Sequence, residues 1–497
     1  MNAEDVGTPR WAAAKGIGLA AAALLSLGLG LEACNKGGAP TAQAPGAPGQ
    51  LGQQQAQVLL AALQDAPSHG FAADRFGAAA IAQQLGSGDA DTRQQGLQRL
   101  RSAILAYARA QHGLGLPAGA MDKNWGQRPA RYDAQAEFNA ALAQNKLPEW
   151  LASLPPPGPA YQALRAGYAA YLKTAAAGGW QPIPDGPPLK PGASDPRVQA
   201  LRSRLAFEDP AVAQADRNAP FDAALGQAVR AYQSRNGLTP SGVVDAATLK
   251  ALNVSAADRA NQIRANLERW RWAPRNPAAD RIEVNSVAGT FDLYLGNAPA
   301  MHMLAAAGKP GDETPILTST VTSVELNPPW KVPDSIADKE LFPKEKRSPG
   351  YFEREGLQVQ PPGQGVKLIQ KPGPKNALGQ VKFQFANDYG VYLHDTPARA
   401  AFSRPQRSVS HGCVRLEKAV DLAKRLLGRE PGWSDQKVDA ALAAADTQQV
   451  PLTHPVQVSL FYWTAVPSAG VIGFRDDVYG WDAELVRLLD ARGSSNG

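Results

Sequence analysis

The chain has 497 residues, and its 51 basic and 45 acidic residues give a formal net charge of +6. This mild charge suits a protein that works near anionic polymer or lipid. No basic cluster interleaved with aromatic residues is present, so nothing indicates nucleic-acid binding. The length is enough for two to four domains.

Residues 1–34 have the pattern of an export signal. Basic residues precede an apolar stretch at 16–31, which is short for a membrane span. Cys34 follows in the run Leu-Glu-Ala-Cys, which resembles the bacterial lipoprotein signal, although Glu32 departs from it. The resemblance implies that Cys34 is lipidated and that the protein is anchored to a membrane in the periplasm. Asn35 favours the outer membrane, because an acidic residue there is associated with inner-membrane retention.

Other interpretations of this segment stay open: cleavage after Ala44, an uncleaved anchor, or the incidental apolar start of a cytoplasmic protein. Either export interpretation places the bulk of the chain in an oxidising compartment. If Cys34 is lipidated, Cys413 has no partner cysteine in its own chain. A lone thiol in an exported protein indicates reactivity, and the alternative is a buried, inert cysteine.

Composition divides the N-terminal half into a linker and helical units. Residues 35–54 are a flexible linker rich in Gly, Ala, Pro and Gln. Apolar stripes at helical spacing predict a helical scaffold domain over 55–182. A proline-rich linker precedes a unit at 195–254, in which we expect three helices, the third capped by Asp245. A further amphipathic helix is expected over 261–274.

Alternating apolar residues replace the helical pattern after this helix and predict a β-rich domain over 275–482. Strands are expected at 282–284, 291–294, 321–326, 381–385, 391–393 and 456–463. Residues 331–370 interrupt the pattern with charges and prolines, so we expect an inserted cap beside the site. The fold class is therefore multidomain α+β.

The chemistry of the chain is concentrated around Cys413, which lies in the run Ser-His-Gly-Cys-Val-Arg, with His394 upstream. The segment offers a nucleophile, imidazoles to take its proton, and a cation for a substrate carboxylate. Gly412 lets backbone N–H groups converge on one point, as an oxyanion hole requires. We expect His394 to end a strand on the face that it shares with Tyr392, and the segment 408–415 to lead into a helix.

The cysteine motif, with the His394 strand before it, resembles the L,D-transpeptidase (YkuD-type) family. Further segments resemble the larger YcbB-type subgroup, at 327–333, 373–379, 392–397 and 474–480. That subgroup combines a helical scaffold, a peptidoglycan-binding unit and a catalytic domain with an inserted cap. The unit at 195–254 resembles the three-helix peptidoglycan-binding domain.

This resemblance implies a role for each residue of the motif. Cys413 is the nucleophile, and His394 is the general base, oriented by the backbone carbonyl of Asp395. Backbone groups of His411, Gly412 and Cys413 shape the oxyanion site. Arg415 would hold structure or a peptide carboxylate, Tyr392 and Asn376 would line the cleft, and Ser410 is expected to contact the substrate. No cofactor or metal is implied.

The implied function is a periplasmic L,D-transpeptidase that forms 3→3 peptidoglycan cross-links with release of D-Ala. Its expected partners are peptidoglycan stem peptides and glycan, and carbapenems are the expected inhibitors. An L,D-carboxypeptidase or amidase-like hydrolase on the same fold stays open, as does a non-catalytic peptidoglycan-binding tether. So does the division of labour between His394 and His411.

A zinc site built from Cys413, His394 and His411 is a further alternative, because three ligands suffice for catalytic zinc. A papain-like thiol protease uses the same chemical logic, but its local signature is absent around Cys413.

Overall fold

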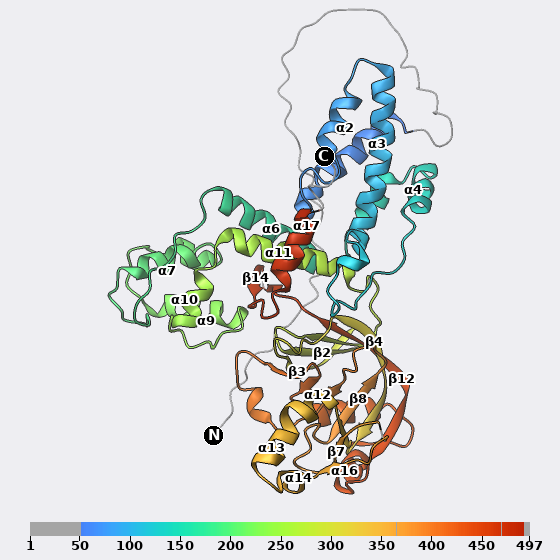
Figure 1. Cartoon of the computed structure of the whole chain (residues 1–497). Helices are drawn as coiled ribbons and strands as arrows, with labels where there is room; N and C mark the ends of the chain where they lie inside the picture. The colour runs from blue at the N-terminus through green and yellow to red at the C-terminus, as the bar shows by residue number, and fades with distance from the viewer. Residues whose placement is uncertain (1–50, 364, 469, 492–497) are drawn as a thin grey trace, which may run out of the picture. The chain divides into compact units, whose positions relative to one another are not determined.

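The computed structural model describes residues 51–363, 365–468 and 470–491 (Figure 1). The predicted export signal and Cys34 lie outside the described residues. So does most of the predicted linker, whose last two positions already belong to helix α1 (Gln53–Gln64). In the described part of the chain, no helix is both long and apolar enough to span a bilayer.

The first helical region contains α1, α2 (Ala78–Leu85), α3 (Ala90–Arg109), α4 (Ala134–Ala143), α5 (Leu147–Ser153) and α6 (Pro159–Ala176). Helices α2 and α3 lie side by side as a hairpin (Figure 1). Asp89 caps α3 by accepting from the Thr92 N–H at 2.8 Å, which satisfies one of the unpaired donors of the first turn. Apolar residues of α1 to α5 share one core, including Leu59, Ile104 and Phe138.

The next unit has four helices: α7 (Arg197–Leu205), α8 (Pro210–Gln214), α9 (Ala223–Arg235) and α10 (Ala246–Leu252). Asp245 caps α10 as expected, accepting from the Thr248 N–H at 2.8 Å. The short α8 was not expected. It is one turn long and has a single buried residue, Val212, so it leaves little periodic signal.

Helix α11 (Ala256–Trp272) begins earlier than expected, because Ser255 caps it and accepts from the Asp258 N–H at 3.1 Å. It packs against α6 and against α17 (Trp481–Ala491). Within α11, Arg271 and Glu268 are both about 1 % exposed and form an ion pair at 2.6 Å.

The β-rich domain is built on one nine-stranded sheet, with strand order β10-β3-β11-β9-β8-β4-β12-β1-β2. Strand β2 also pairs with β3, so the sheet closes on itself. Its strands are β1 (Arg281–Asn285), β2 (Thr290–Leu295), β3 (Ala298–Gly308), β4 (Leu317–Leu326), β8 (Val381–Phe385), β9 (Leu393–His394), β10 (Ser408–Ser410), β11 (Val414–Leu416) and β12 (Gln448–Phe461). A separate hairpin joins β13 (Ala465–Ser468) to β14 (Val471–Phe474).

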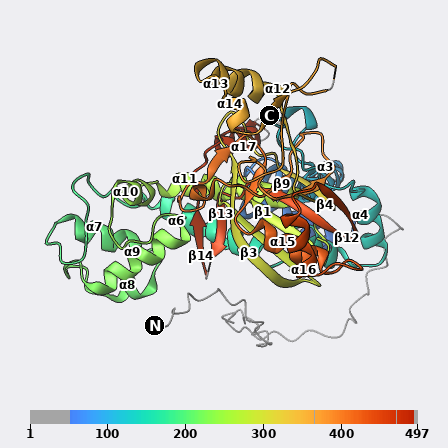
Figure 2. The same cartoon turned by 90° about the horizontal axis from the view of Figure 1, so that it is seen from below.

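Helices α15 (Ala419–Leu427) and α16 (Asp435–Ala443) lie against the sheet and share its core (Figure 2). The expected apolar face of α15 is buried, with Leu422 and Leu426 at 0 and 1 % exposure. Residues 408–415 lead into this helix as expected, although two short strands that were not expected come before it. Strands β10 and β11 flank Cys413, because both pair with β3.

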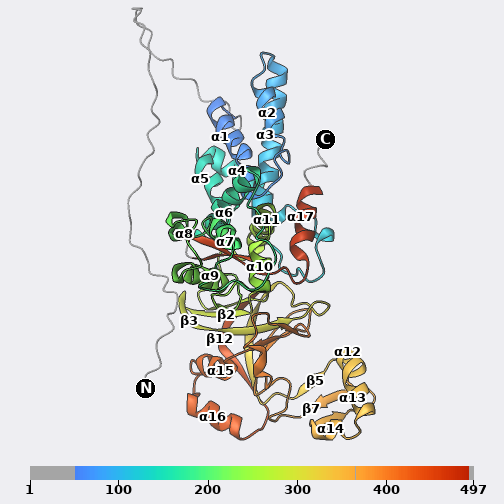
Figure 3. The same ribbon diagram turned by 90° about the vertical axis from the view of Figure 1, so that its left-hand side faces the viewer.

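Residues 330–370 form a cap lobe with its own small sheet of β5 (Trp330–Val332), β7 (Leu368–Gln370) and β6 (Leu357–Val359). The helices α12 (Asp334–Ile336), α13 (Phe342–Arg347) and α14 (Tyr351–Arg354) complete it (Figure 3). Val332, Leu341 and Leu368 contribute to its own apolar cluster. The charges and prolines that interrupt the strand pattern therefore belong to a folded insertion.

Candidate active site

Cys413, His394 and Arg415 line one pocket of about 240 Å³. Tyr392 lines the same pocket, and the cap lobe supplies Trp330 and other lining residues. The pocket therefore lies where the ends of β9 and β11 meet the cap lobe. The sequence motif and the upstream histidine strand, which are separate in the chain, form one site.

The turn that carries Cys413 is held by side-chain hydrogen bonds. Gly412 has a φ of +101°, in the left-handed region that favours glycine. The Ser410 hydroxyl donates to the Cys413 carbonyl at 2.5 Å and accepts from the Gly412 N–H at 3.2 Å. Thr314 donates to the Gly412 carbonyl at 2.7 Å. Ser410 thus fixes the backbone at Cys413 and is itself 2 % exposed.

This arrangement changes the expected oxyanion site. The Gly412 N–H is already bonded to Ser410, so it does not point freely at a substrate. In the described part of the chain, the Cys413 N–H has no hydrogen-bond acceptor. The Cys413 N–H is therefore a backbone donor that the turn leaves available for developing negative charge.

His394 is 4 % exposed. Its Nδ1 donates to the Asp395 carbonyl at 2.5 Å, the contact expected from the sequence. Burial, the Arg415 guanidinium and Lys382 lower the pKa of His394 to about 3, although carbonyls of Asp395 and Leu378 act in the opposite direction. The imidazole is therefore neutral at pH 7, and its Nε2 is the nitrogen available to accept a proton.

Burial raises the pKa of the Cys413 thiol, because the thiolate loses its solvation. Contacts from Tyr392 and the positive charges of Lys382 and Arg415 act against this effect. The resting pocket thus contains a neutral thiol and a neutral imidazole. A base that removes the proton during attack fits this state better than a preformed thiolate.

His394 lies between two cations on neighbouring strands. In the strand register it is directly opposite Lys382 on β8 and Arg415 on β11. Lys382 Nζ lies 4.3 Å from the Tyr392 ring centroid and 3.7 Å from Glu325. The sequence interpretation missed Lys382. Its signal was the alternation of 381–385, which places Lys382 on the face opposite the buried Val381 and Phe383.

Arg415 is half-buried and lines the pocket. Burial lowers its pKa, and Cys413 is the charge that acts in the opposite direction. Across the residues that the structure describes, no carboxylate forms an ion pair with this guanidinium. A partly desolvated cation without a counter-charge attracts a ligand anion.

His411 is directed to the cap lobe. Its Nε2 lies 2.6 Å from Glu340 Oε1 and 3.3 Å from Lys309 Nζ. Glu340 belongs to the cap-lobe segment 337–341 and also lines the pocket. The geometry therefore favours His394 as the base and gives His411 a contact with the cap.

Asn376 was expected to line the cleft, and the structure places it behind the wall. It is 1 % exposed, and its amide donates to the carbonyls of Pro328 and Lys371 at 3.0 Å each. Its side-chain oxygen accepts from the Leu378 N–H at 2.7 Å. Since Ala377 and Leu378 line the pocket, Asn376 braces the loop that carries them.

The structure also bears on the alternative of a metal site. Within residues 51–363, 365–468 and 470–491, no group of three or more His, Cys, Asp or Glu side chains is arranged to hold an ion. One ring nitrogen of His394 bonds to a backbone carbonyl, and one ring nitrogen of His411 contacts Glu340.

Comparison with protein families gives matches to three parts of the chain. Residues 279–451 match the L,D-transpeptidase catalytic domain (YkuD) family. Residues 48–167 match a scaffold domain family, and residues 194–252 match a peptidoglycan-binding domain family.

A Haemophilus influenzae protein named "Putative L,D-transpeptidase" is 34 % identical over 220 residues. That match covers 41 % of this chain and 45 % of the relative, so less than half of the relative's length is spanned. Among solved structures, an L,D-transpeptidase from Mycobacterium smegmatis is 18 % identical, with a TM-score of 0.20, covering 37 % of this chain and 58 % of that one. A Mycobacterium tuberculosis L,D-transpeptidase 3 with a faropenem-derived adduct is 16 % identical, with a TM-score of 0.20, covering 37 % and 60 %.

The family matches and the site lie in the same part of the chain. Cys413, His394 and Arg415 all fall within residues 279–451. The chain therefore carries a catalytic domain of the L,D-transpeptidase family, together with a peptidoglycan-binding domain.

Proposed function

We propose that the chain is a peptidoglycan L,D-transpeptidase that forms 3→3 cross-links by acyl transfer through Cys413. The observation that carries the proposal is the shared pocket of Cys413, His394 and Arg415, in which the Asp395 carbonyl holds the imidazole. This set supplies a nucleophile, a neutral base and a cation for a substrate carboxylate.

In the first half-reaction, Cys413 Sγ attacks the carbonyl carbon that joins the third residue of a tetrapeptide stem to D-Ala. Nε2 of His394 takes the thiol proton as the S–C bond forms. The carbonyl oxygen becomes an oxyanion, and the Cys413 N–H is the donor that faces it. Collapse breaks the C–N bond, D-Ala leaves with the proton from His394, and a thioester remains.

In the second half-reaction, the side-chain amine of another stem attacks the thioester carbonyl. His394 accepts the amine proton, and the S–C bond then breaks. Cys413 recovers the proton as a thiol, so the enzyme returns to its starting state. Acyl transfer of this kind needs no cofactor. The Arg415 guanidinium is suited to hold a stem-peptide carboxylate in both steps.

The test is incubation of the purified protein with a tetrapeptide stem. Cross-linked dimer and released D-Ala in equal amounts are expected, and both should be absent with Cys413→Ala. Free D-Ala without dimer would favour the L,D-carboxypeptidase alternative, and no release at all would favour a peptidoglycan-binding tether. A carbapenem should add its mass to the wild type and not to Cys413→Ala.

The proposal also includes the location of the protein. We propose export to the periplasm and lipidation of Cys34, supported by the apolar segment before it and by the peptidoglycan-binding domain. Cells given radiolabelled palmitate should label the wild type and not Cys34→Ala. Equal labelling of both would overturn the lipid anchor and leave the acyl-transfer proposal intact.

A further inference from the structure

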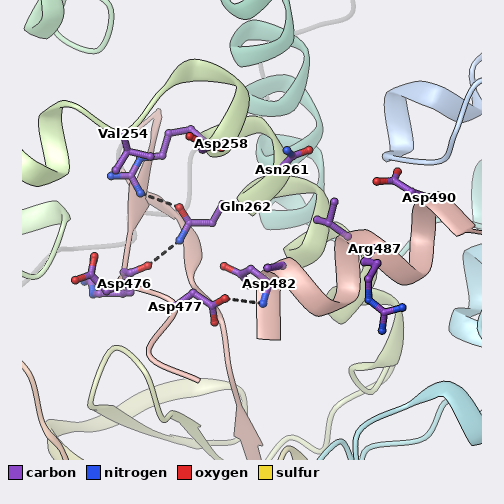
Figure 4. Close-up of a pocket in the computed structure, with 13 residues that line it drawn as sticks. Val254, Asp258, Asn261, Gln262, Asp476, Asp477, Asp482, Arg487 and Asp490 are labelled. Atoms are coloured by element: carbon purple, nitrogen blue, oxygen red, sulfur yellow. Dashed lines mark hydrogen bonds between the residues drawn. The ribbon is translucent and has the colours of Figure 1, made fainter. Parts of the chain in front are cut away.

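Two cavities lined by charged side chains lie away from Cys413. They differ in whether acidic residues lie among the basic ones. A cavity of about 550 Å³ lies beside α11 and α17 (Figure 4). Its carboxylates are already engaged: Asp482 accepts from Thr464 at 2.7 Å, Asp490 pairs with Arg264 at 2.5 Å, and Asp477 accepts from the Tyr462 hydroxyl at 2.8 Å. This cavity is therefore lined by both acidic and basic side chains, since Arg259, Arg475 and Arg487 lie among these aspartates, and it does not present charge of one sign.

A second cavity, of about 680 Å³, is different, and we name it the arginine pocket. It is lined by residues 126–132 and 271–276, with His112 and Thr318. Arg128, Arg131 and Arg275 contribute guanidinium groups, and no Asp or Glu is among the described residues that line it. Its size is that of a typical small-molecule site, and it shares no lining residue with the Cys413 pocket.

Arg275 is the fixed cation of the arginine pocket. Its guanidinium donates to the backbone carbonyls of Ser153, Leu154 and Pro155 at 2.6, 3.0 and 2.7 Å. These neutral acceptors orient the group without balancing its charge. Arg275 is half-buried, and burial lowers its pKa, with only tyrosines acting in the opposite direction. A partly desolvated, oriented guanidinium without a carboxylate is a receptor for an anion.

The other two arginines are available to a ligand. Arg131 is exposed and, within the described residues, makes no hydrogen bond or ion pair. Arg128 has one long contact, to the Gln127 carbonyl at 3.4 Å. Both side chains can therefore turn toward an anion without breaking an ion pair.

One wall of the arginine pocket is a flat aromatic surface. The rings of His112 and Tyr132 stack at 3.5 Å between centroids, with 7° between their planes. Burial and Arg275 lower the pKa of His112 to about 4, so this wall is neutral at pH 7. A ligand that combines carboxylates with an uncharged body fits such a surface better than a bare inorganic ion.

We propose that the arginine pocket binds the carboxylate-bearing stem peptide of peptidoglycan at a position separate from Cys413. The proposal rests on the proposed function for the identity of the polymer, and on the unbalanced guanidiniums for the chemistry. Arg275 fixes one carboxylate, and Arg128 and Arg131 close on the ligand from the 126–132 segment. The bound stem would hold a peptidoglycan strand on the enzyme while another stem occupies the Cys413 pocket.

The test is calorimetric titration of the full chain with a soluble disaccharide-tetrapeptide. Cys413→Ala is used as the background so that no turnover occurs. Three classes of site are expected in this background: the Cys413 pocket, the arginine pocket and the peptidoglycan-binding domain. Arg128→Gln combined with Arg131→Gln should remove one class or weaken it at least tenfold. The matched control is Arg99→Gln, an exposed arginine on α3 outside the pocket, and it should keep all three.

Identical isotherms for the double variant and the Arg99→Gln control would overturn the proposal. Inorganic phosphate is titrated separately. Competition by phosphate for the arginine-dependent class supports an oxyanion site, whereas phosphate binding at these arginines without stem-peptide binding would overturn the assignment to peptidoglycan. Melting temperatures equal to that of the background are expected for both exposed-arginine variants. Because binding is measured without turnover, failure of the cross-linking reaction would not affect this result.

Discussion

His411 Nε2 lies 2.6 Å from Glu340 Oε1, so the residue two positions before Cys413 is bound to the cap lobe. Residues of this lobe line the Cys413 pocket, including Trp330, Ile336 and Leu341. The contact links the turn that carries Cys413 to the insertion beside it. The cap lobe has its own apolar cluster, which is separate from the core of the nine-stranded sheet.

Glu340→Ala should therefore increase access to Cys413. Surface ion pairs contribute up to about 1 kcal/mol, so a rate increase of up to about fivefold is expected. Iodoacetamide labelling of Cys413, followed by mass spectrometry, measures it. Glu353→Ala is the matched control, since Glu353 is an exposed cap-lobe residue outside the pocket. Equal labelling rates in both variants would show that this contact does not restrict the pocket.

Lys382→Met should raise the pKa of Cys413 further, because one of the two cations near the sulfur is lost. The pH profile of Cys413 alkylation should move upward by about one unit, equivalent to about 1.4 kcal/mol. Lys173→Met, an exposed lysine near the end of α6, should leave the profile unchanged.

Removal of Lys382 also leaves Glu325 without its cation, which can lower stability. The double variant Lys382→Met with Glu325→Gln removes both charges, so that no unpaired carboxylate remains and the change in the Cys413 pKa can be measured in a stable protein. An alkylation profile of the double variant that matches the wild type would contradict the role of Lys382.

His394→Gln should lower kcat/KM by about 10²- to 10⁴-fold, the range for loss of a general base. The wild-type pH profile is equally informative. Since the pKa of His394 is lowered to about 3, the base stays neutral throughout pH 5–8. No loss of activity with a midpoint near 6.5 is expected as pH falls. An acid limb at 6.5 that disappears in His394→Gln would mean that the imidazole is solvated during turnover.

Stability should fall as pH falls below about 6.5. His69 is 2 % exposed and bonded through Nδ1 to the Tyr161 hydroxyl at 3.0 Å. Burial, Arg165 and Arg271 lower its pKa to about 2. Since its folded pKa lies below the unfolded value, the unfolded chain binds the extra proton between pH 6.5 and 2. The folded state is therefore destabilised there, by up to about 1.4 kcal/mol per pH unit.

Urea unfolding at pH 7 and pH 5 measures this effect. His69→Gln keeps a polar side chain at the position and should reduce the difference between the two pH values. A His302→Gln variant should not reduce it, because the His302 side chain is exposed and Asp292 raises its pKa. An unchanged pH dependence in His69→Gln would assign the acid sensitivity to other groups.

The sequence was informative where local patterns are strong. The alternation of Val391 to His394 predicted which side chains share a face, and the structure buries Val391 and Leu393 in the core. The strands around Cys413 were missed, because each is three residues long and pairs with β3, which lies about a hundred residues earlier. Such pairing leaves no periodic signal in so short a segment.

The site residues were predictable only in part, for a related reason. The motif around Cys413 is contiguous, but Lys382 reaches the sulfur through strand register and Glu340 through the fold of the cap lobe. Asn376 shows the reverse. It lies in a distinctive sequence segment and was expected to line the cleft. Its amide instead donates to three backbone carbonyls. Proximity in space and satisfaction of hydrogen bonds are tertiary properties that spacing along the chain does not encode.

Arg415→Gln should raise KM for the stem peptide more than it lowers kcat, because the guanidinium is placed to hold a carboxylate that persists through the reaction. A loss of about 1.5–3 kcal/mol in binding is expected for one charged hydrogen-bonding group, or about 10- to 100-fold in KM. Arg415→Lys keeps the charge and loses the paired N–H donors of the guanidinium, so it should recover only part of the affinity.

Arg415 also lies directly opposite His394 in the sheet. Loss of its charge should therefore raise the pKa of His394, and imidazole NMR shifts in Arg415→Gln should report this change. A variant with unchanged KM and a large fall in kcat would instead assign Arg415 to the positioning of the base.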